Sequence, residues 1–129
     1  MGRKILVIDD EPDIISFFED SLRGLGYQVL SATDGLSGLE LARRERPNLL
    51  ILDLMLPKMD GYRVCALLKN DTRFAKIPII LFSSRAQEED IQLGHEMGAC
   101  AYVTKPFNPQ TFFTQIEEIL KNEEGARFV

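Results

Sequence analysis

Three aspartates follow apolar segments in a pattern that could create a site for a divalent cation. Asp9 and Asp10 come directly after the aliphatic run at 5–8, and Asp53 ends the run at 49–52. An ionised carboxylate at the end of an apolar segment costs free energy unless something stabilises its charge. Carboxylates that converge raise one another's pKa unless a cation is bound, and hard oxygen ligands with open positions favour Mg²⁺. The three residues therefore predict a magnesium site.

Two more polar side chains follow later apolar runs and could serve the same site. Lys105 follows the run at 99–103 and precedes Pro106, where it could act as a mobile positive charge for an anion. A cis peptide bond, which is accessible mainly before proline, would aim this lysine inward. Ser83 follows the run at 77–82, and its hydroxyl could donate a hydrogen bond to a phosphoryl oxygen.

Each of these residues also has a purely structural alternative. Asp10 could cap the helix that follows it, and Asp53 could form a turn or cap the next helix. Lys105 could be a solvated loop residue, and Ser83 could be a helix N-cap, a role for which Ser84 competes. The position of the whole set at the ends of apolar runs favours the chemical interpretation.

Five short apolar runs predict the strands that position these side chains. The runs do not alternate between polar and apolar residues, which is typical of strands buried on both faces of a parallel sheet. They are ILVI at 5–8, YQVL at 27–30, LLIL at 49–52, IPIILF at 77–82 and ACAYV at 99–103.

Segments with helical periodicity lie between and after the runs. Their apolar residues are Ile14, Ile15, Phe18, Leu22 and Leu25, then shorter stripes within 36–45, 62–69 and 87–97, and finally Phe112, Phe113, Ile116, Ile119 and Leu120. Pro12 suits a first helical turn, Gly26 and Gly98 suit the left-handed position after a helix, and Pro47 can end the second helix.

The predicted fold class is α/β, a (βα)5 doubly wound five-stranded parallel sheet with the flavodoxin-like order 2-1-3-4-5. Ligands bind such sheets outside the carboxyl ends of the first and third strands, so the three aspartates should meet there. We expect one domain over residues 1–122. Residues 123–129 would form a short C-terminal tail that can begin a linker, and the frayed-looking sequence NEEGARFV starts at 122.

Composition and charge narrow the classes of function. Hydrophobic residues make up 45 % and charged residues 27 %, as in ordinary globular domains, and a net charge of −5 argues against direct nucleic-acid binding. Cys65 and Cys100 lie in apolar patterns at a separation that matches no zinc or redox motif, which predicts buried thiols in a reducing compartment. The sequence has neither a secretory h-region nor the roughly twenty apolar residues that span a bilayer. The expected location is cytoplasmic, with no membrane partner.

Four motifs together resemble the receiver domain of two-component response regulators. They are IDDEP at 8–12, DLMLPKMDG at 53–61, PIILFSS at 78–84 and YVTKPF at 102–107. The resemblance covers essentially the whole chain, in order and at the spacing of the family. It implies a phospho-accepting regulatory domain that is not an enzyme in the usual sense, although it takes part in its own magnesium-dependent phosphorylation and slow autodephosphorylation.

The resemblance assigns the acidic residues. Asp53 matches the phospho-acceptor, while Asp9 and Asp10 match the acidic pair that holds the metal together with Asp53. The backbone carbonyl of Met55 is the further ligand expected from the family. The implied ion is Mg²⁺, for which Mn²⁺ can substitute.

The resemblance also assigns the residues that respond to phosphorylation. Ser83 matches the hydroxyl residue that contacts the phosphoryl group, Lys105 matches the lysine that pairs with it, and Tyr102 matches the aromatic rotamer switch on the fifth strand. The acyl phosphate is then expected to shift the face made by the fourth helix, fifth strand and fifth helix. The chain departs from the family at Ser84, where Ala or Gly is usual and an extra hydroxyl can narrow access to the phosphoryl group.

The partners implied by the resemblance are proteins. The phosphoryl donor would be the phosphohistidine of a sensor histidine kinase or of a phosphotransfer protein. The output would be a downstream effector protein or domain, and a phosphorylation-dependent homodimer is a further form that this output can take.

Three other functions compete with this one. A magnesium-dependent phosphohydrolase needs a second aspartate two residues after its nucleophile, where Met55 stands. A nucleotide-binding module would carry GxGxxG or GxxxxGK[ST], and neither occurs in the sequence. An interaction module that never accepts phosphate would lack an acid, the hydroxyl or the lysine; all are present, so only Ser84 gives this alternative weight.

Overall fold

Five strands form one parallel sheet with the order 2-1-3-4-5, which confirms the topology predicted from the sequence. The computed structural model describes residues 2–126, with the side chains of residues 2–122. The strands are β1 (Lys4–Ile8), β2 (Gln28–Ala32), β3 (Leu49–Asp53), β4 (Ile79–Ser83) and β5 (Ala101–Thr104). Their register aligns Ile8 with Leu52 and Asp53 with Phe82, so the ends of β1, β3 and β4 lie next to one another.

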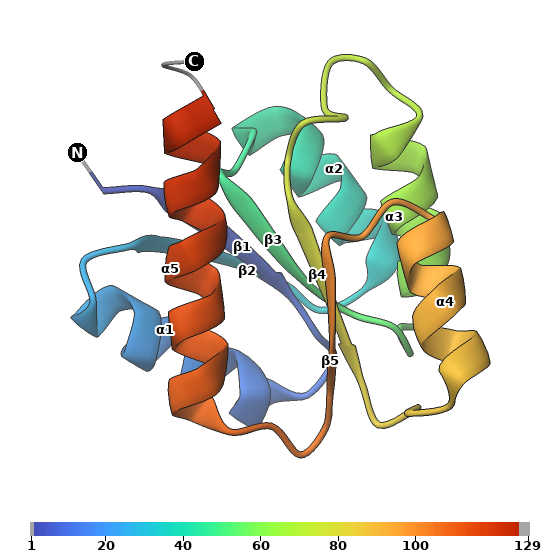
Figure 1. The fold of residues 1–129 in the computed structure, drawn as a ribbon, viewed down its shortest axis with the longest axis horizontal. Helices are drawn as coiled ribbons and strands as arrows, with labels where there is room; N and C mark the ends of the chain where they lie inside the picture. Colours follow the sequence, from blue (N-terminus) through green and yellow to red (C-terminus); the bar gives the residue numbers. More distant parts are fainter. Residues whose placement is uncertain (1, 127–129) are drawn as a thin grey trace.

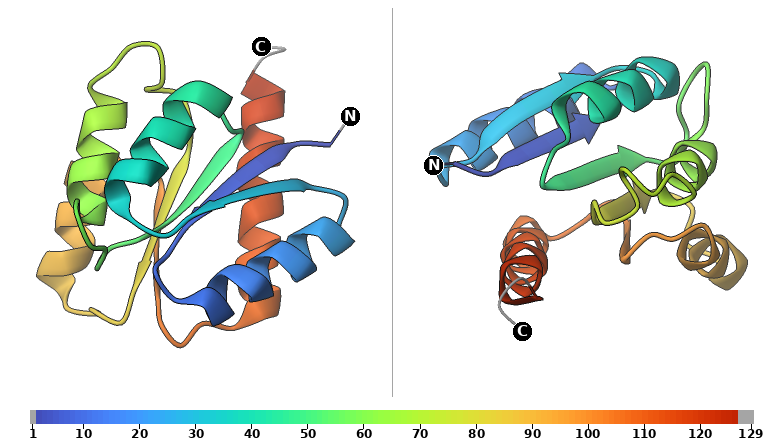
Figure 2. Two further views of the ribbon diagram at one scale, coloured as in Figure 1. Left: turned by 180° about the vertical axis from the view of Figure 1, so that it is seen from behind. Right: turned by 90° about the horizontal axis from the view of Figure 1, so that it is seen from above.

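Helices cover both faces of the sheet, which is why its strands carry apolar residues on both sides. One apolar cluster packs α1 and α5 against one face, and a second packs α2 and α3 against the other, where α4 also lies (Figures 1 and 2). The helices are α1 (Pro12–Gly24), α2 (Gly35–Glu45), α3 (Gly61–Lys69), α4 (Glu88–Glu96) and α5 (Pro109–Ala126).

The first and last helical stripes predicted from the sequence are largely correct. Every third or fourth residue of α1 and α5 reaches the core, namely Ile15, Phe18, Leu22, Phe112, Ile116 and Leu120. Leu25, which the sequence placed on the same stripe, is instead 51 % exposed. The reason is that α1 ends at Gly24, so Leu25 no longer follows the helical turn that would carry it to the core.

The helix boundaries follow the predicted punctuation. Pro12 occupies the first turn of α1, where its missing N–H would have no helical partner. Gly26 and Gly98 both adopt positive φ, 94° and 107°, which glycine tolerates without steric cost. Before Pro47, Arg46 turns left-handed at φ 47° and ends α2.

Two expectations about the surface differ from the structure. The last helix continues to Ala126, past residue 122 where the sequence suggested that a frayed tail begins; residues 127–129 lie outside the described part of the chain.

The two cysteines differ in burial. Cys65 is buried as predicted, whereas the prediction for Cys100 is wrong because it is exposed. Cys100 lies directly before β5, and its N–H already donates to the carbonyl oxygen of Ile79 on β4, but its side chain stays at the surface.

Candidate functional site

The ends of β1 and β3 bring the three predicted aspartates together. Asp9 follows β1 and Asp53 is the last residue of β3, and both are buried, while Asp10 is exposed. One carboxylate oxygen from each of the three lies within 4.8 Å of the others. This is the convergence that the parallel topology predicted, and the three residues offer hard oxygen ligands of the kind that Mg²⁺ and Ca²⁺ use.

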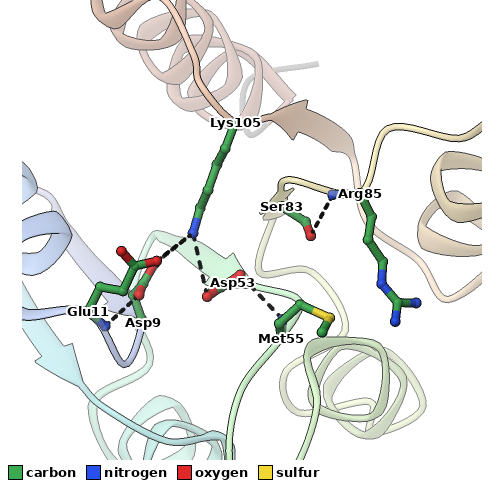
Figure 3. Close-up of polar contacts among 7 residues, drawn as sticks. All are labelled: Asp9, Glu11, Asp53, Met55, Ser83, Arg85 and Lys105. Carbon is green, nitrogen blue, oxygen red and sulfur yellow. Dashed lines mark hydrogen bonds and ion pairs between the residues drawn. The ribbon is translucent and has the colours of Figure 1, made fainter.

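Lys105 reaches this acidic cluster from the loop after β5. Its Nζ lies 3.3 Å from Asp9 Oδ2, 3.6 Å from Asp53 Oδ2 and 3.5 Å from Glu11 Oε1 (Figure 3). The ammonium also sits 4.6 Å from the centre of the Phe82 ring, on the neighbouring strand. The Lys105–Pro106 peptide bond is cis, as the sequence suggested.

Sequence reasoning missed two of these contacts. Glu11 lies two residues after Asp9 inside the IDDEP motif, so its spacing was visible, but its role beside Lys105 depends on the fold. Phe82 was assigned only to the apolar strand, although its register opposite Asp53 places its ring beside the site. No local pattern links either residue to a lysine far away in the sequence.

Backbone amides fix the orientation of the two buried carboxylates. The N–H of Glu11 donates to Asp9 Oδ1 at 2.8 Å, and the N–H of Met55 donates to Asp53 Oδ1 at 3.3 Å. In both cases the other oxygen, Oδ2, faces Lys105. Met55 itself is 53 % exposed.

The electrostatics of the site favour an added cation or proton. Burial, reinforced by the neighbouring charge of Asp9, raises the pKa of Asp53 from 3.8 to about 6, although Lys105 opposes the shift. Burial also raises the pKa of Asp9, against the effects of the Glu11 amide and of Lys105. Burial alone would lower the pKa of Lys105, but the attraction of Asp53 and Asp9 outweighs it and raises that pKa.

Ser83 lies at the end of β4, on the other side of Asp53 from Asp9 (Figure 3). Its side chain is buried, and its Oγ accepts a hydrogen bond from the N–H of Arg85 at 3.2 Å. Ser84, the residue that departs from the family pattern, is exposed on the loop that follows. The hydroxyl of Tyr102 donates to the carbonyl oxygen of Arg85 at 2.8 Å, so this loop is tied to β5.

The helix-capping alternatives are contradicted by the observed helix starts. The N-cap residue of α1 is Glu11, not Asp10, and that of α4 is Gln87, not Ser83 or Ser84. The side chain that caps α3 is Asp60, which accepts from the N–H of Arg63, so Asp53 does not cap that helix. Lys105 is not simply a solvated loop residue, because its side chain is only 18 % exposed and pairs with three carboxylates.

The fold and the site define an α/β domain in which a doubly wound parallel sheet carries an acidic cluster, a lysine and a buried hydroxyl at its carboxyl edge. The family model for the response regulator receiver domain matches residues 5–117, and the chain belongs to this family. It is a phospho-accepting regulatory domain of the two-component type, not an enzyme in the usual sense.

Comparisons with curated proteins give relatives that are about twice as long as this chain. The alkaline phosphatase synthesis transcriptional regulatory protein PhoP of Bacillus subtilis is 40 % identical over 126 residues, which cover 98 % of this chain and 52 % of PhoP. The DNA-binding dual master transcriptional regulator RpaA of Synechocystis is 39 % identical over 121 residues, covering 94 % of this chain and 50 % of RpaA. The chain thus spans about half the length of these relatives.

Solved structures share the same fold. The chemotaxis response regulator CheY4 of Vibrio cholerae superposes with a TM-score of 0.86 at 28 % identity, over 92 % of this chain and 99 % of CheY4. The BeF3-activated DrrB receiver domain superposes with a TM-score of 0.84 at 31 % identity, over 94 % of this chain and 99 % of that one.

Within residues 2–126 of our chain, no helix is both long and apolar enough to cross a membrane.

Proposed function

We propose that Asp53 is the phospho-acceptor of this receiver domain. The observation that carries the proposal is the buried Asp53 carboxylate, held by the Met55 amide at 3.3 Å and by the Lys105 ammonium at 3.6 Å, at the open edge of the sheet. A nucleophilic carboxylate must be ionised and partly desolvated, and its repulsion from an incoming phosphoryl group must be screened. The acidic cluster and the lysine meet these needs together.

Asp9, Asp10 and Asp53 would hold a divalent ion, with the backbone carbonyl of Met55 as a further ligand. The donor set fits such an ion, since three carboxylate oxygens within 4.8 Å of one another form a concentrated negative charge that one lysine does not neutralise. Oxygen-only ligands with open positions favour Mg²⁺, and Mn²⁺ can substitute for it. When bound, the ion offsets negative charge on the transferring phosphoryl group.

The chemical step proposed for Asp53 is the transfer of a phosphoryl group from a donor phosphohistidine. A carboxylate oxygen of Asp53 attacks phosphorus in line, a new P–O bond forms, and the P–N bond to the imidazole of a donor phosphohistidine breaks. The donor imidazole leaves with the electron pair of that bond and takes up a proton. Lys105 and the Ser83 hydroxyl would then bind phosphoryl oxygens, and water later hydrolyses the acyl phosphate.

The new group would act as a switch because it carries about −1.5 to −2 charge in place of the single charge of the Asp53 carboxylate, and it places strong acceptor oxygens beside Ser83 and Lys105. Movement of Ser83 toward it would shift the loop that carries Arg85, whose carbonyl now binds the Tyr102 hydroxyl at 2.8 Å. Tyr102 would turn inward and reshape the face made by α4, β5 and α5. Phosphorylation needs only to favour one of two states of this face by a few kcal/mol.

The proposed partners are a sensor histidine kinase or phosphotransfer protein as donor, and an effector protein or domain as output. Curated relatives of twice the length are named as transcriptional regulators, which supports an effector domain in the parent protein. A phosphorylation-dependent homodimer through the α4, β5 and α5 face is a further form of output. We propose that the domain acts in the cytoplasm and that it does not itself bind nucleic acid. We also propose that its receiver unit comprises residues 1–122, with the end of α5 continuing beyond it to Ala126.

Intact mass after incubation with acetyl phosphate tests the proposal for Asp53. The wild type should gain the mass of one phosphoryl group in the presence of Mg²⁺, and the gain should be lost when the ion is chelated. Asp53→Asn should not gain mass, whereas the control Asp20→Asn, which changes an exposed carboxylate on α1, should behave like the wild type. Equal labelling of Asp53→Asn would reject Asp53 as the acceptor, and no labelling of the wild type would favour a constitutive interaction module.

A further inference from the structure

The loop that follows Asp53 contains an unusual backbone conformation. Lys58 has a φ of 68°, in the left-handed region that a side chain with a Cβ adopts only at a steric cost. Such a conformation persists when the surrounding structure imposes it. The N–H of Met59 donates to the carbonyl oxygen of Pro57 at 2.8 Å, which closes a three-residue turn centred on Lys58, and the N–H of Gly61 donates to the carbonyl oxygen of Leu54 at 2.9 Å. The loop, which also carries the Met55 carbonyl, is thus held partly by its own hydrogen bonds.

The start of α2 contacts this loop from outside. The N–H of Gly35 donates to the carbonyl oxygen of Pro57 at 3.2 Å, and Asp34 Oδ2 lies 3.8 Å from the Lys58 ammonium. A Cβ on Gly35 would lie 1.8 Å from the Met59 carbonyl oxygen, so the two backbones are in direct contact. Figure 1 shows α2 beside α3, and the first turns of these helices flank the loop.

The Asp34 side chain also has a second, separable role in α2. Its Oδ1 accepts from the N–H of Ser37 at 2.7 Å and its Oδ2 accepts from the Ser37 hydroxyl at 3.0 Å, which caps the helix. These hydrogen bonds lower the pKa of Asp34, assisted by Lys58. Asp34 is therefore ionised, fixed by its own helix and turned toward Lys58.

We propose that Asp34 and Lys58 are positioning residues for the metal site: their ion pair, with the Gly35 contact, steadies the 54–60 loop, which carries the Met55 carbonyl expected to join the cluster of Asp9, Asp10 and Asp53. This inference rests on the proposed function, because it takes the cluster with the Met55 carbonyl to be the Mg²⁺ site. Neither Asp34 nor Lys58 is proposed to touch the ion.

The effects of Asp34→Asn and Lys58→Ala on Mg²⁺ affinity distinguish a positioning role from a purely electrostatic one. If only charge mattered, Asp34→Asn would weaken Mg²⁺ binding, while Lys58→Ala, which removes a positive charge, would strengthen it. If the pair positions the loop, both variants weaken binding. The asparagine keeps an oxygen that can accept from the Ser37 amide, so the cap of α2 is retained.

The experiment is a calorimetric Mg²⁺ titration of the unphosphorylated protein, together with urea unfolding of each variant. We expect Asp34→Asn and Lys58→Ala each to weaken Mg²⁺ binding by about two- to fivefold, the effect of losing a partly exposed ion pair. The double variant should bind no more weakly than the weaker single variant, because both remove the same interaction. Lys58→Arg, which keeps the positive charge, should bind Mg²⁺ with the affinity of the wild type. Lys76→Ala, which removes an exposed charge at the opposite end of β4, should also leave the Mg²⁺ affinity unchanged.

Each outcome has a defined meaning. Tighter Mg²⁺ binding by Lys58→Ala, or additive losses in the double variant, would overturn the positioning role while leaving the metal site intact. Wild-type affinity in both single variants would do the same. A wild type that binds no Mg²⁺ would instead refute the metal site on which the inference rests.

Discussion

Replacing Asp53 with asparagine should stabilise the metal-free protein at neutral pH. Asp53 has its pKa raised from 3.8 to about 6, chiefly by burial and secondarily by Asp9. The folded protein therefore binds this proton more tightly than the unfolded chain does, and stability falls as the pH rises from 3.8 through about 6. Asparagine resembles the protonated acid and avoids this loss.

The size of the effect follows from the shift of the Asp53 pKa. The difference between 3.8 and about 6 corresponds to about 3 kcal/mol of unfolding free energy once the pH is above both values. Lys105 already contributes to that balance, since its ammonium lies 3.6 Å from Asp53 Oδ2 and favours the ionised form. The asparagine can still accept from the Met55 amide, so no backbone hydrogen bond need be lost.

Urea unfolding of the two proteins across the pH range, with a chelator present, measures the effect. Asp53→Asn should be more stable than the wild type by about 3 kcal/mol near neutral pH, and the difference should vanish below pH 3.8, where the acid is protonated in both states. Asp20→Asn, an exposed change on α1, should stay within about 0.5 kcal/mol of the wild type.

Two results would refute this reasoning. A variant that is less stable than the wild type near neutral pH would mean that the ion pair with Lys105 outweighs the burial of Asp53. A difference that does not change with pH would show that ionisation of Asp53 is not its cause. Addition of Mg²⁺ should narrow the difference, because an ion that binds only the folded wild type stabilises it by mass action.

Three further changes probe the site and its support. Lys105→Met should destabilise the metal-free protein near neutral pH by about 1 to 3 kcal/mol in urea unfolding, because Asp53 loses its nearby cation; an unchanged midpoint would contradict the pairing. Gly61→Ala should lower the free energy of unfolding by about 1 to 3 kcal/mol in thermal unfolding, since its Cβ would lie 2.6 Å from the Asp53 carbonyl oxygen. The control Gly24→Ala, whose Cβ meets no atom within 4 Å, should not destabilise the protein. Phe18→Ala should cost about 3 to 5 kcal/mol by calorimetry, because the ring is fully buried between α1 and the sheet; a loss below about 1 kcal/mol would mean that the core can collapse around it.

Much of the framework follows from local patterns in the sequence. Apolar runs without alternation predict strands buried on both faces, and helical spacing predicts the segments that cover them. Because parallel strands end at one edge of a sheet, the sequence alone places Asp9, Asp53 and Ser83 there. Gly98 could be predicted to be left-handed because steric limits on φ act within a single residue.

Only the tertiary structure decided which side chains meet at that edge. Lys105 lies 96 residues from Asp9 in the chain, and its approach to Glu11 and Phe82 depends on how β5 and its loop pack beside β4. The left-handed Lys58 was not predicted either; the turn around it is local, but its contacts with the start of α2 exist only in the folded chain. Local propensity and periodicity act over a few residues, whereas contacts between distant segments exist only after the whole sheet has formed and its layers have packed.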